Sequence, residues 1–135
     1  MHGKIKYLNW IERADLRKNP SNFFLFGDNI ARAGLGGQAA EMRGESNAIG
    51  IATKRRPNMH PDSFFSDLRV SDRMALLADL SEVELKLAAG YTVICPSSGL
   101  GTGLSELPIR APLLYSNLKK WFQMRSENNE CPWSY

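Results

Sequence analysis

The feature that most constrains this chain is an apolar run that leads into a loop with glycine at every second position. Residues 92–95 are mostly apolar and β-branched, and the loop after them carries Gly99, Gly101 and Gly103. Glycine accepts positive φ and lets a ligand come close to bare backbone. Alternating glycines between the carboxyl end of a strand and the start of a helix form a cup of N–H groups that suits phosphate. Open α/β sheets usually bind their ligands at such strand ends.

A second glycine-rich loop lies earlier in the chain. The apolar run 23–26 is followed by Gly27-Asp28-Asn29 and then by the segment 33–38. Because each loop follows an apolar run, we expect the two to hold one anionic ligand from two sides. The alternative is two tight turns without a ligand, although ordinary turns rarely need three glycines each. The predicted ligand-binding residues are Asp28, Asn29, Gly34, Gly36, Gly37, Gln38, Ser98, Gly99, Leu100, Gly101, Thr102, Gly103 and Leu104.

The rest of the chain alternates between strand-like and helix-like segments. Leu76, Leu80, Val83 and Leu87 recur at the spacing of one helix face, and Gly90 follows as a C-terminal cap. The alternation predicts an α/β domain with a small sheet of four or five strands, which we expect to be mixed. The predicted strands are 4–8, 22–26, 47–53 and 91–95, and the predicted helices are 9–18, 37–44, 71–89 and 111–125.

The length of 135 residues predicts a single domain, residues 1–135, with a polar C-terminal tail at about 126–135. Trp133 and Tyr135 are the residues of this tail that we expect to pack back on the domain. Asn9 and Glu12 have the spacing of a capping box, with Asn9 as the N-cap of the first helix. We expect no metal, because neither the cysteines nor the histidines form a ligand pattern.

Cysteine usage and hydropathy bear on the location of the protein. Cys95 ends an apolar run, where a small buried residue is expected, and Cys131 lies in the predicted tail. No apolar run is long enough to span a bilayer, and the N-terminus lacks the apolar core of a signal peptide. We therefore expect a cytoplasmic protein without a disulfide, a cofactor or a membrane partner.

The charge pattern favours a small phosphorylated ligand over a nucleic acid. A formal net charge of +3 is compatible with either partner. The densest basic segment, residues 54–56, has no interleaved aromatic side chains of the kind that single-strand binders use. Arg32 and Arg43 flank the first glycine loop, where either could contact a diphosphate or be a solvated surface charge. The stacking surface for a base is expected from Phe64, Phe65 or Tyr115.

Three segments together resemble a known family. Residues 96–104 are similar to the phosphate-binding loop of macrodomains, and residues 27–39 resemble the earlier ribose and phosphate segment of that family. Residues 51–54 (Ile-Ala-Thr-Lys) resemble a strand of the compact macrodomain branch that removes ADP-ribose from glutamate. The order and spacing agree over roughly residues 22–122. Small bacteriophage proteins carry similar Gly-Asp-Asn and Gly-Leu-Gly-Thr-Gly elements, which would place the protein in a host cytoplasm.

The resemblance implies a three-layer α/β/α macrodomain-like fold and a ligand of the ADP-ribose type. The ligand would be ADP-ribose, a related NAD-derived nucleotide, or an ADP-ribosylated protein. Asp28 would accept a hydrogen bond from the adenine amino group, Gly36 and Gly37 would lie beside the distal ribose, and residues 99–103 would wrap the diphosphate.

The resemblance is weaker for catalysis than for binding. The compact branch has an aspartate where this chain has Ser105, and its catalytic lysine lies in a segment that this shorter chain lacks. Glu106 is then the candidate general base and Lys54 the candidate cation for a phosphate. The alternatives are a first-turn glutamate favoured by the helix dipole and a lysine on the rim of the site.

The predicted activity is nucleotide binding, with hydrolysis of the ligand or removal of ADP-ribose from protein as the enzymatic option. A small nucleic-acid-binding protein that uses residues 54–56 is one further possibility, and two other functions also stay open from the sequence. One is a Rossmann-like nucleotide hydrolase, in which a Gly-x-Gly-Thr element is followed by glutamate, as in residues 101–106. The other is a non-catalytic module that sequesters a nucleotide signal.

Overall fold

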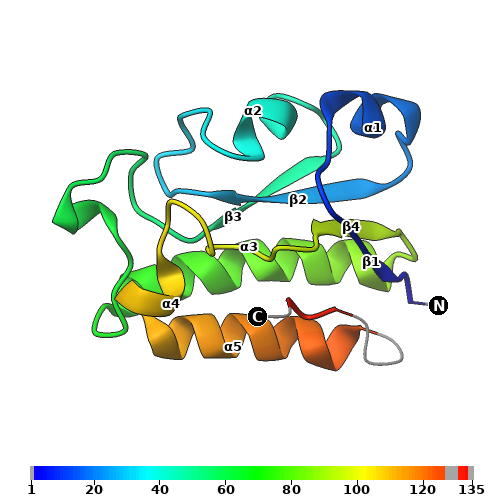
Figure 1. Ribbon diagram of the computed structural model, residues 1–135. Coiled ribbons are helices and arrows are strands. Elements are labelled where there is room, and N and C mark those ends of the chain that lie inside the picture. The colour runs from blue at the N-terminus through cyan, green and yellow to red at the C-terminus, as the bar shows by residue number, and fades with distance from the viewer. Residues whose placement is uncertain (1, 127–130, 134–135) are drawn as a thin grey trace.

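The centre of the domain is a four-stranded sheet in the order β1-β4-β2-β3 (Figure 1), in a computed structural model that describes residues 2–126 and 131–133. The strand pairings β1–β4, β2–β4 and β2–β3 are all parallel. The predicted α/β class is confirmed, but the expectation of a mixed sheet is wrong for the strands that the structure describes. Each connection between successive strands contains a helix, and such crossovers return the chain in the same direction. The strands are β1 (Ile5–Leu8), β2 (Phe23–Asp28), β3 (Ala48–Ala52) and β4 (Val93–Pro96).

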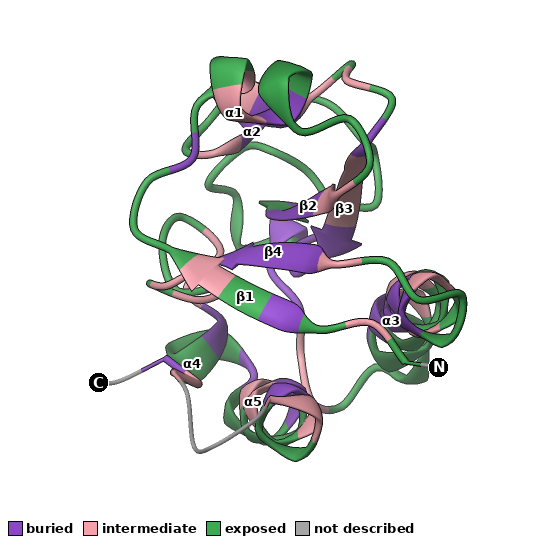
Figure 2. Ribbon diagram, turned by 90° about the vertical axis from the view of Figure 1, so that its right-hand side faces the viewer, coloured by how far each residue is buried: buried purple, intermediate pink, exposed green. Residues whose placement is uncertain are grey.

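Helices cover both faces of the sheet, which gives three layers (Figures 1 and 2). Two short helices, α1 (Arg13–Lys18) and α2 (Ala39–Met42), lie on one face. The longer helices α3 (Val70–Ala88) and α5 (Pro112–Arg125) lie on the other face. One-turn helices at Pro61–Ser63 and Leu107–Arg110 (α4) belong to the connections.

Helix α1 starts later than the sequence suggested. Its capping interaction is formed by Glu12, whose main-chain N–H donates to Asp15 Oδ2 at 2.8 Å, so the prediction of Asn9 as N-cap is wrong. The reason is that the Gln38 side-chain amide is hydrogen bonded to both the N–H and the carbonyl group of Ile11. Ile11 N–H donates to Gln38 Oε1 at 2.9 Å, and Gln38 Nε2 donates to Ile11 O at 2.7 Å. With both backbone groups engaged in this way, Ile11 makes none of the helical hydrogen bonds of α1.

Helix α3 agrees with the periodicity read from the sequence. Leu76, Leu80, Val83 and Leu87 are buried along its inner face against the sheet. Gly90 follows the C-cap residue Ala89 and has φ +92°, the left-handed conformation that ends helices and favours glycine. None of the helices in the described part of the chain is long and apolar enough to cross a membrane.

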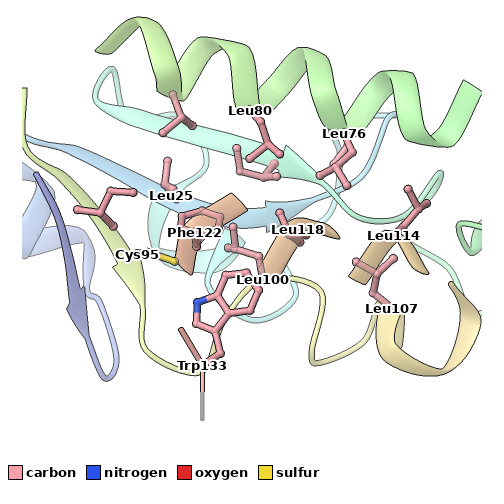
Figure 3. Packing of buried hydrophobic residues seen from close by; sticks show 14 of the residues in the cluster. Leu25, Leu76, Leu80, Cys95, Leu100, Leu107, Leu114, Leu118, Phe122 and Trp133 are labelled. Atoms are coloured by element: carbon pink, nitrogen blue, oxygen red, sulfur yellow. The ribbon is translucent and has the colours of Figure 1, made fainter. Parts of the chain in front are cut away.

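The C-terminal segment is not merely a polar tail. Trp133 is 1% exposed, and its ring centroid lies 5.0 Å from that of Phe122 on α5 (Figure 3). Gly99 has φ +92°, and a Cβ there would lie 2.7 Å from Trp133 Cδ2. The indole therefore packs against the bare backbone of the second glycine loop. Tyr135, the other residue expected to pack back, lies outside the described residues.

The two cysteines are free thiols. Cys95 is buried in the core as expected, and burial raises the pKa of its thiol well above the ordinary value. Cys131 Sγ contacts the carbonyl oxygen of Ser97 at 3.4 Å, which ties the C-terminal segment to the end of β4.

We expect Trp133→Ala to lower the free energy of unfolding by about 3–5 kcal/mol, because it leaves a large cavity in the core. Urea denaturation followed by circular dichroism measures this change. Trp10→Ala is the matched control, since Trp10 is 56% exposed and its loss should change stability by less than about 0.5 kcal/mol. Equal effects of the two substitutions would contradict a core role for Trp133.

Candidate functional site

The candidate site lies where the chain leaves β2 and β4 in opposite directions. After β2 the chain runs to α2 on one face of the sheet, and after β4 it runs to α4 and α5 on the other (Figure 1). The two strands are paired only at Phe23–Val93 and Phe24–Ile94, so their carboxyl ends are not joined to each other. A parallel sheet has a crevice at such a point, and this is where α/β proteins usually bind ligands.

The two glycine loops meet in this crevice, as predicted from their positions after neighbouring strands. A Cβ on Gly27 would lie 3.7 Å from the main-chain nitrogen of Gly101. A Cβ on Gly36 would lie 3.0 Å from Leu104 Cδ1. Figure 1 shows the cyan loop after β2 and the yellow loop after β4 leaving the same edge of the sheet.

Two adjoining cavities form the cleft between the loops. The first has a volume of about 260 Å³ and is lined by Asp28, Arg43 and Lys54 together with the first loop; we call it the basic cavity. The second has a volume of about 350 Å³, and we call it the glycine-loop cavity because residues 98–105 form much of its wall. Both cavities are lined by Gly27, Gly36, Leu104 and Ser105.

The two loops contain main-chain N–H groups that have no acceptor among the described residues. In residues 2–126 and 131–133, no N–H group of the segments 34–38 and 100–105 donates a hydrogen bond to another protein group. The second loop is nevertheless held firmly. Gly101 O accepts from Leu107 N–H at 2.9 Å, Gly103 O accepts from Glu106 N–H at 3.0 Å, and Thr102 Oγ1 donates to Ser98 O at 2.9 Å. The loop thus uses carbonyl groups for its internal hydrogen bonds and not the N–H groups of residues 100–105 in the described part of the chain.

Asp28 is engaged within the protein. Its Oδ1 accepts from Arg43 Nη2 at 2.6 Å and from Asn29 N–H at 2.8 Å, and its Oδ2 lies 3.4 Å from both Arg32 and Arg43. A Cβ on Gly50 would overlap this carboxylate, which is why β3 carries glycine at that position. With its oxygens occupied, Asp28 has little capacity to accept a further hydrogen bond from a base. Its place in the cleft is that of a buried anchor for Arg43.

The two arginines beside the first loop differ in position. Arg43 lines the basic cavity, and its Nε also donates to Gly34 O at 2.8 Å, so its guanidinium is fixed against the loop. Arg32 points to Asp79, with which it makes hydrogen bonds of 2.8 and 2.9 Å, and it does not line either cavity. Of the two arginines, only Arg43 is therefore placed to face a ligand.

Of the two candidate catalytic residues, Lys54 lines the cleft and Glu106 does not. Lys54 is buried and lines the basic cavity, where its Nζ donates to Asn58 O at 2.7 Å and lies 4.6 Å from the Phe64 ring centroid. Burial lowers the pKa of Lys54, although the negative charge of Glu106 opposes the change. Glu106 lines neither cavity and is hydrogen bonded to Arg110 at 3.0 Å.

One hydroxyl group that the sequence prediction did not select, that of Ser105, lines the cleft, and it contacts the buried hydroxyl of Thr53 behind it. Ser105 lines both cavities, and its Oγ is 2.7 Å from Thr53 Oγ1. Thr53 Oγ1 donates in turn to Asp28 O at 3.3 Å, so the end of β3 is connected to both loops. The position of Ser105 directly after the Gly-Thr-Gly-Leu element is the signal that could have identified it.

The remaining predicted residues form the frame of the site. Asn29 Nδ2 donates to Ala33 O at 2.8 Å and shapes the first loop, and Gln38 lines the glycine-loop cavity while its amide holds Ile11. The expected stacking residues lie elsewhere: Phe64 and Phe65 are buried, and Tyr115 packs towards Trp133, with 6.2 Å between ring centroids. Within the described residues, no group of three His, Cys, Asp or Glu side chains is placed to hold a metal ion.

The chain belongs to a family of unknown function (DUF7831), whose model matches residues 6–121. The match includes β2, β3, β4 and both glycine loops, so the whole cleft lies inside the family's region. No curated protein and no solved structure matches the chain. The likeness to macrodomains and to bacteriophage proteins therefore stays a prediction from the sequence.

We expect Asp28→Asn to lower the free energy of unfolding by about 1.5–3 kcal/mol, the usual worth of a hydrogen bond to a charged group. The loss arises because Arg43 and Arg32 would face a neutral partner. A double-mutant cycle with Arg43→Met, measured by urea denaturation, should give a coupling energy of at least about 0.5 kcal/mol. Additive effects of the two substitutions would show that Asp28 does not anchor Arg43.

Proposed function

We propose that the cleft binds a nucleotide through its phosphate groups, with ADP-ribose or a related NAD-derived nucleotide as the ligand class. The observation that carries this proposal is the pair of glycine loops at the switch point of the sheet, with the N–H groups of residues 34–38 and 100–105 without protein partners. Free main-chain donors on two sides of a cleft suit an anion with several oxygen atoms. The sequence resemblance to macrodomains supports the finer assignment to ADP-ribose, either free or attached to a protein.

The energetics favour main-chain donors over helix dipoles as the source of affinity. Helices α2 and α4 have four residues each, which is too short for a substantial macrodipole. A micromolar ligand requires about 8 kcal/mol of binding free energy. Hydrogen bonds to a charged group contribute about 1.5–3 kcal/mol each, so roughly three to five N–H groups would supply it. In the basic cavity, Lys54 adds positive charge, whereas the charge of Arg43 is balanced by Asp28.

Binding without cleavage is the function that the site geometry supports best. A hydrolytic step needs a base within hydrogen-bond reach of the attacking water. Glu106, the carboxylate expected for this role, is paired with Arg110 and lies outside the lining of both cavities. Asp28, the carboxylate that does line the cleft, is occupied by Arg43. We therefore propose a binding module and assign Lys54 to phosphate contact.

The basic segment 54–56 gives little support to a nucleic-acid interface. Lys54 is buried in the cleft, and Arg55 forms a bidentate pair with the buried Asp72, with distances of 2.9 and 2.8 Å. Arg56 is the residue of this segment that is exposed. A single exposed cation does not form the basic stripe that phosphate-backbone binding requires.

We expect ADP-ribose at a hundredfold excess over its Kd to stabilise the domain by about 2.7 kcal/mol, seen as a rise in melting temperature. Gly36→Val should abolish this rise, because the new side chain enters the middle of the cleft beside Leu104. The fold should tolerate the change, since the contacted atom is the end of a flexible, 61% exposed side chain. Gly101 is unsuited to the test, because a Cβ there would meet Leu107 at 3.0 Å.

The matched control is Ala31→Val, which adds the same branched side chain to an exposed position of the first loop outside the cavity lining. It should respond to ADP-ribose as the unmodified chain does. AMP, NAD and pyrophosphate in the same assay define the part of the ligand that is recognised. No shift with any of the four compounds would overturn the proposal.

We expect ADP-ribose to be recovered intact after long incubation with the protein, because among the described residues the one carboxylate that lines the cleft, Asp28, is paired with Arg43. Anion-exchange chromatography of the mixture measures this directly. Release of AMP or ribose phosphate would overturn the assignment as a binding module. Loss of that release in Glu106→Gln, with binding retained, would then identify Glu106 as the base.

A further inference from the structure

Trp10 is an aromatic side chain of the cleft that the proposed function leaves without a role. It lines the glycine-loop cavity together with residues 98–99 and 101–105 and is 56% exposed. Within residues 2–126 and 131–133, its indole makes no ring contact and no hydrogen bond. Single exposed apolar residues are common on proteins, so exposure alone does not assign a function to this one.

The backbone around Trp10 is tied to both glycine loops. On one side, Leu8 O accepts from Ser97 N–H at 2.7 Å and Asn9 Oδ1 accepts from Ser97 Oγ at 2.8 Å, which joins the turn to the second loop. On the other side, the Gln38 amide makes two hydrogen bonds to Ile11, which joins the turn to the first loop. Trp10 lies in the chain between these hydrogen-bonded residues, so its backbone is held in place at the cavity wall.

The cavity offers a planar group apolar contact from more than one side. Leu104, 61% exposed, lines the same cavity as Trp10 and also lies beside Gly36. Residues 101–105, whose N–H groups have no acceptor among the described residues, line the same cavity. A ligand with a phosphate and an aromatic ring can satisfy the donors and cover the apolar surfaces together. Bases stack well on exposed aromatic side chains held in this way.

We propose that Trp10 is the stacking surface for the nucleobase of the bound nucleotide. The inference rests on the proposed function, and it sets the direction of the ligand in the cleft. The base lies in the glycine-loop cavity, the phosphates lie along the second loop and extend to Lys54, and the remaining part lies beside Arg43 in the basic cavity. The resemblance to macrodomains implied the opposite orientation, with the adenine amino group hydrogen bonded to Asp28. The orientation proposed here agrees with the ion pair between Asp28 and Arg43.

The test compares a ligand that has a base with one that has none. Isothermal titration gives the Kd of ADP-ribose and of pyrophosphate for the unmodified chain, Trp10→Ala and Trp10→Phe. Trp10→Ala should weaken ADP-ribose by about 5- to 150-fold, the range that stacking on one aromatic residue supplies. Pyrophosphate affinity should stay within about twofold, and Trp10→Phe should keep most of the affinity for ADP-ribose.

The matched control is Trp121→Ala, which removes a partly buried tryptophan on α5, outside the lining of the cleft. It should leave both dissociation constants unchanged. A second measurement uses the emission of Trp10 itself. ADP-ribose should quench tryptophan fluorescence in the unmodified chain and in Trp121→Phe, and the quenching should be lost in Trp10→Phe.

The possible outcomes separate the two proposals. If the unmodified chain binds neither compound, the proposed function fails and the inference fails with it. If ADP-ribose binds but Trp10→Ala retains its affinity, the inference alone is overturned. Equal losses for ADP-ribose and pyrophosphate would also overturn it, because Trp10 would then shape the phosphate loop rather than contact a base. The same holds if pyrophosphate binds the unmodified chain as tightly as ADP-ribose does.

Discussion

The pairing of β2 with β4 in a parallel sheet is the constraint on which the cleft depends. These two strands share only the pairs Phe23–Val93 and Phe24–Ile94, and the chain leaves them towards opposite faces of the sheet. The divergence leaves room for two loops at the same edge, with no helix to fill the space between them. If either crossover ran over the other face, one loop would lie on top of the other and the crevice would close. The two cavities therefore depend first on the topology of the sheet and only then on the side chains that line them.

Buried polar contacts then fix the two loops relative to each other. Asp28 anchors Arg43 beside the first loop, and Thr53 connects Asp28 to Ser105 in the second. Gln38 fastens the first loop to Ile11. Each of the side chains of Asp28, Thr53 and Gln38 makes at least two hydrogen bonds, which limit the number of conformations that the loops can adopt. A preorganised cleft loses less conformational entropy when a ligand binds, which leaves more of the contact energy for affinity.

The sequence allowed the strands, the α3 face and the meeting of the glycine loops to be predicted, because these depend on local patterns. Apolar runs and helical spacing are properties of short segments. The interactions that the sequence could not specify join residues far apart in the chain. From the sequence, Asp28 is a turn residue with a free carboxylate, but in the structure it is hydrogen bonded to Arg43. Similarly, Gln38 is expected to cap a helix, but its side chain is hydrogen bonded to Ile11. In the same way, Trp133 follows a polar segment and becomes core only because Gly99 leaves space for its ring.

The distribution of charge explains why an anion site in this protein would rely on main-chain donors. The net charge is +3, yet several arginines form ion pairs with carboxylates of the same chain. Arginines neutralised in this way cannot also supply a strong positive field at the surface. Free N–H groups fixed in a loop recognise the arrangement of oxygen atoms rather than net charge alone, so they favour a ligand of defined shape. The arginines in these pairs are Arg13, Arg17, Arg32, Arg43, Arg55, Arg110 and Arg125.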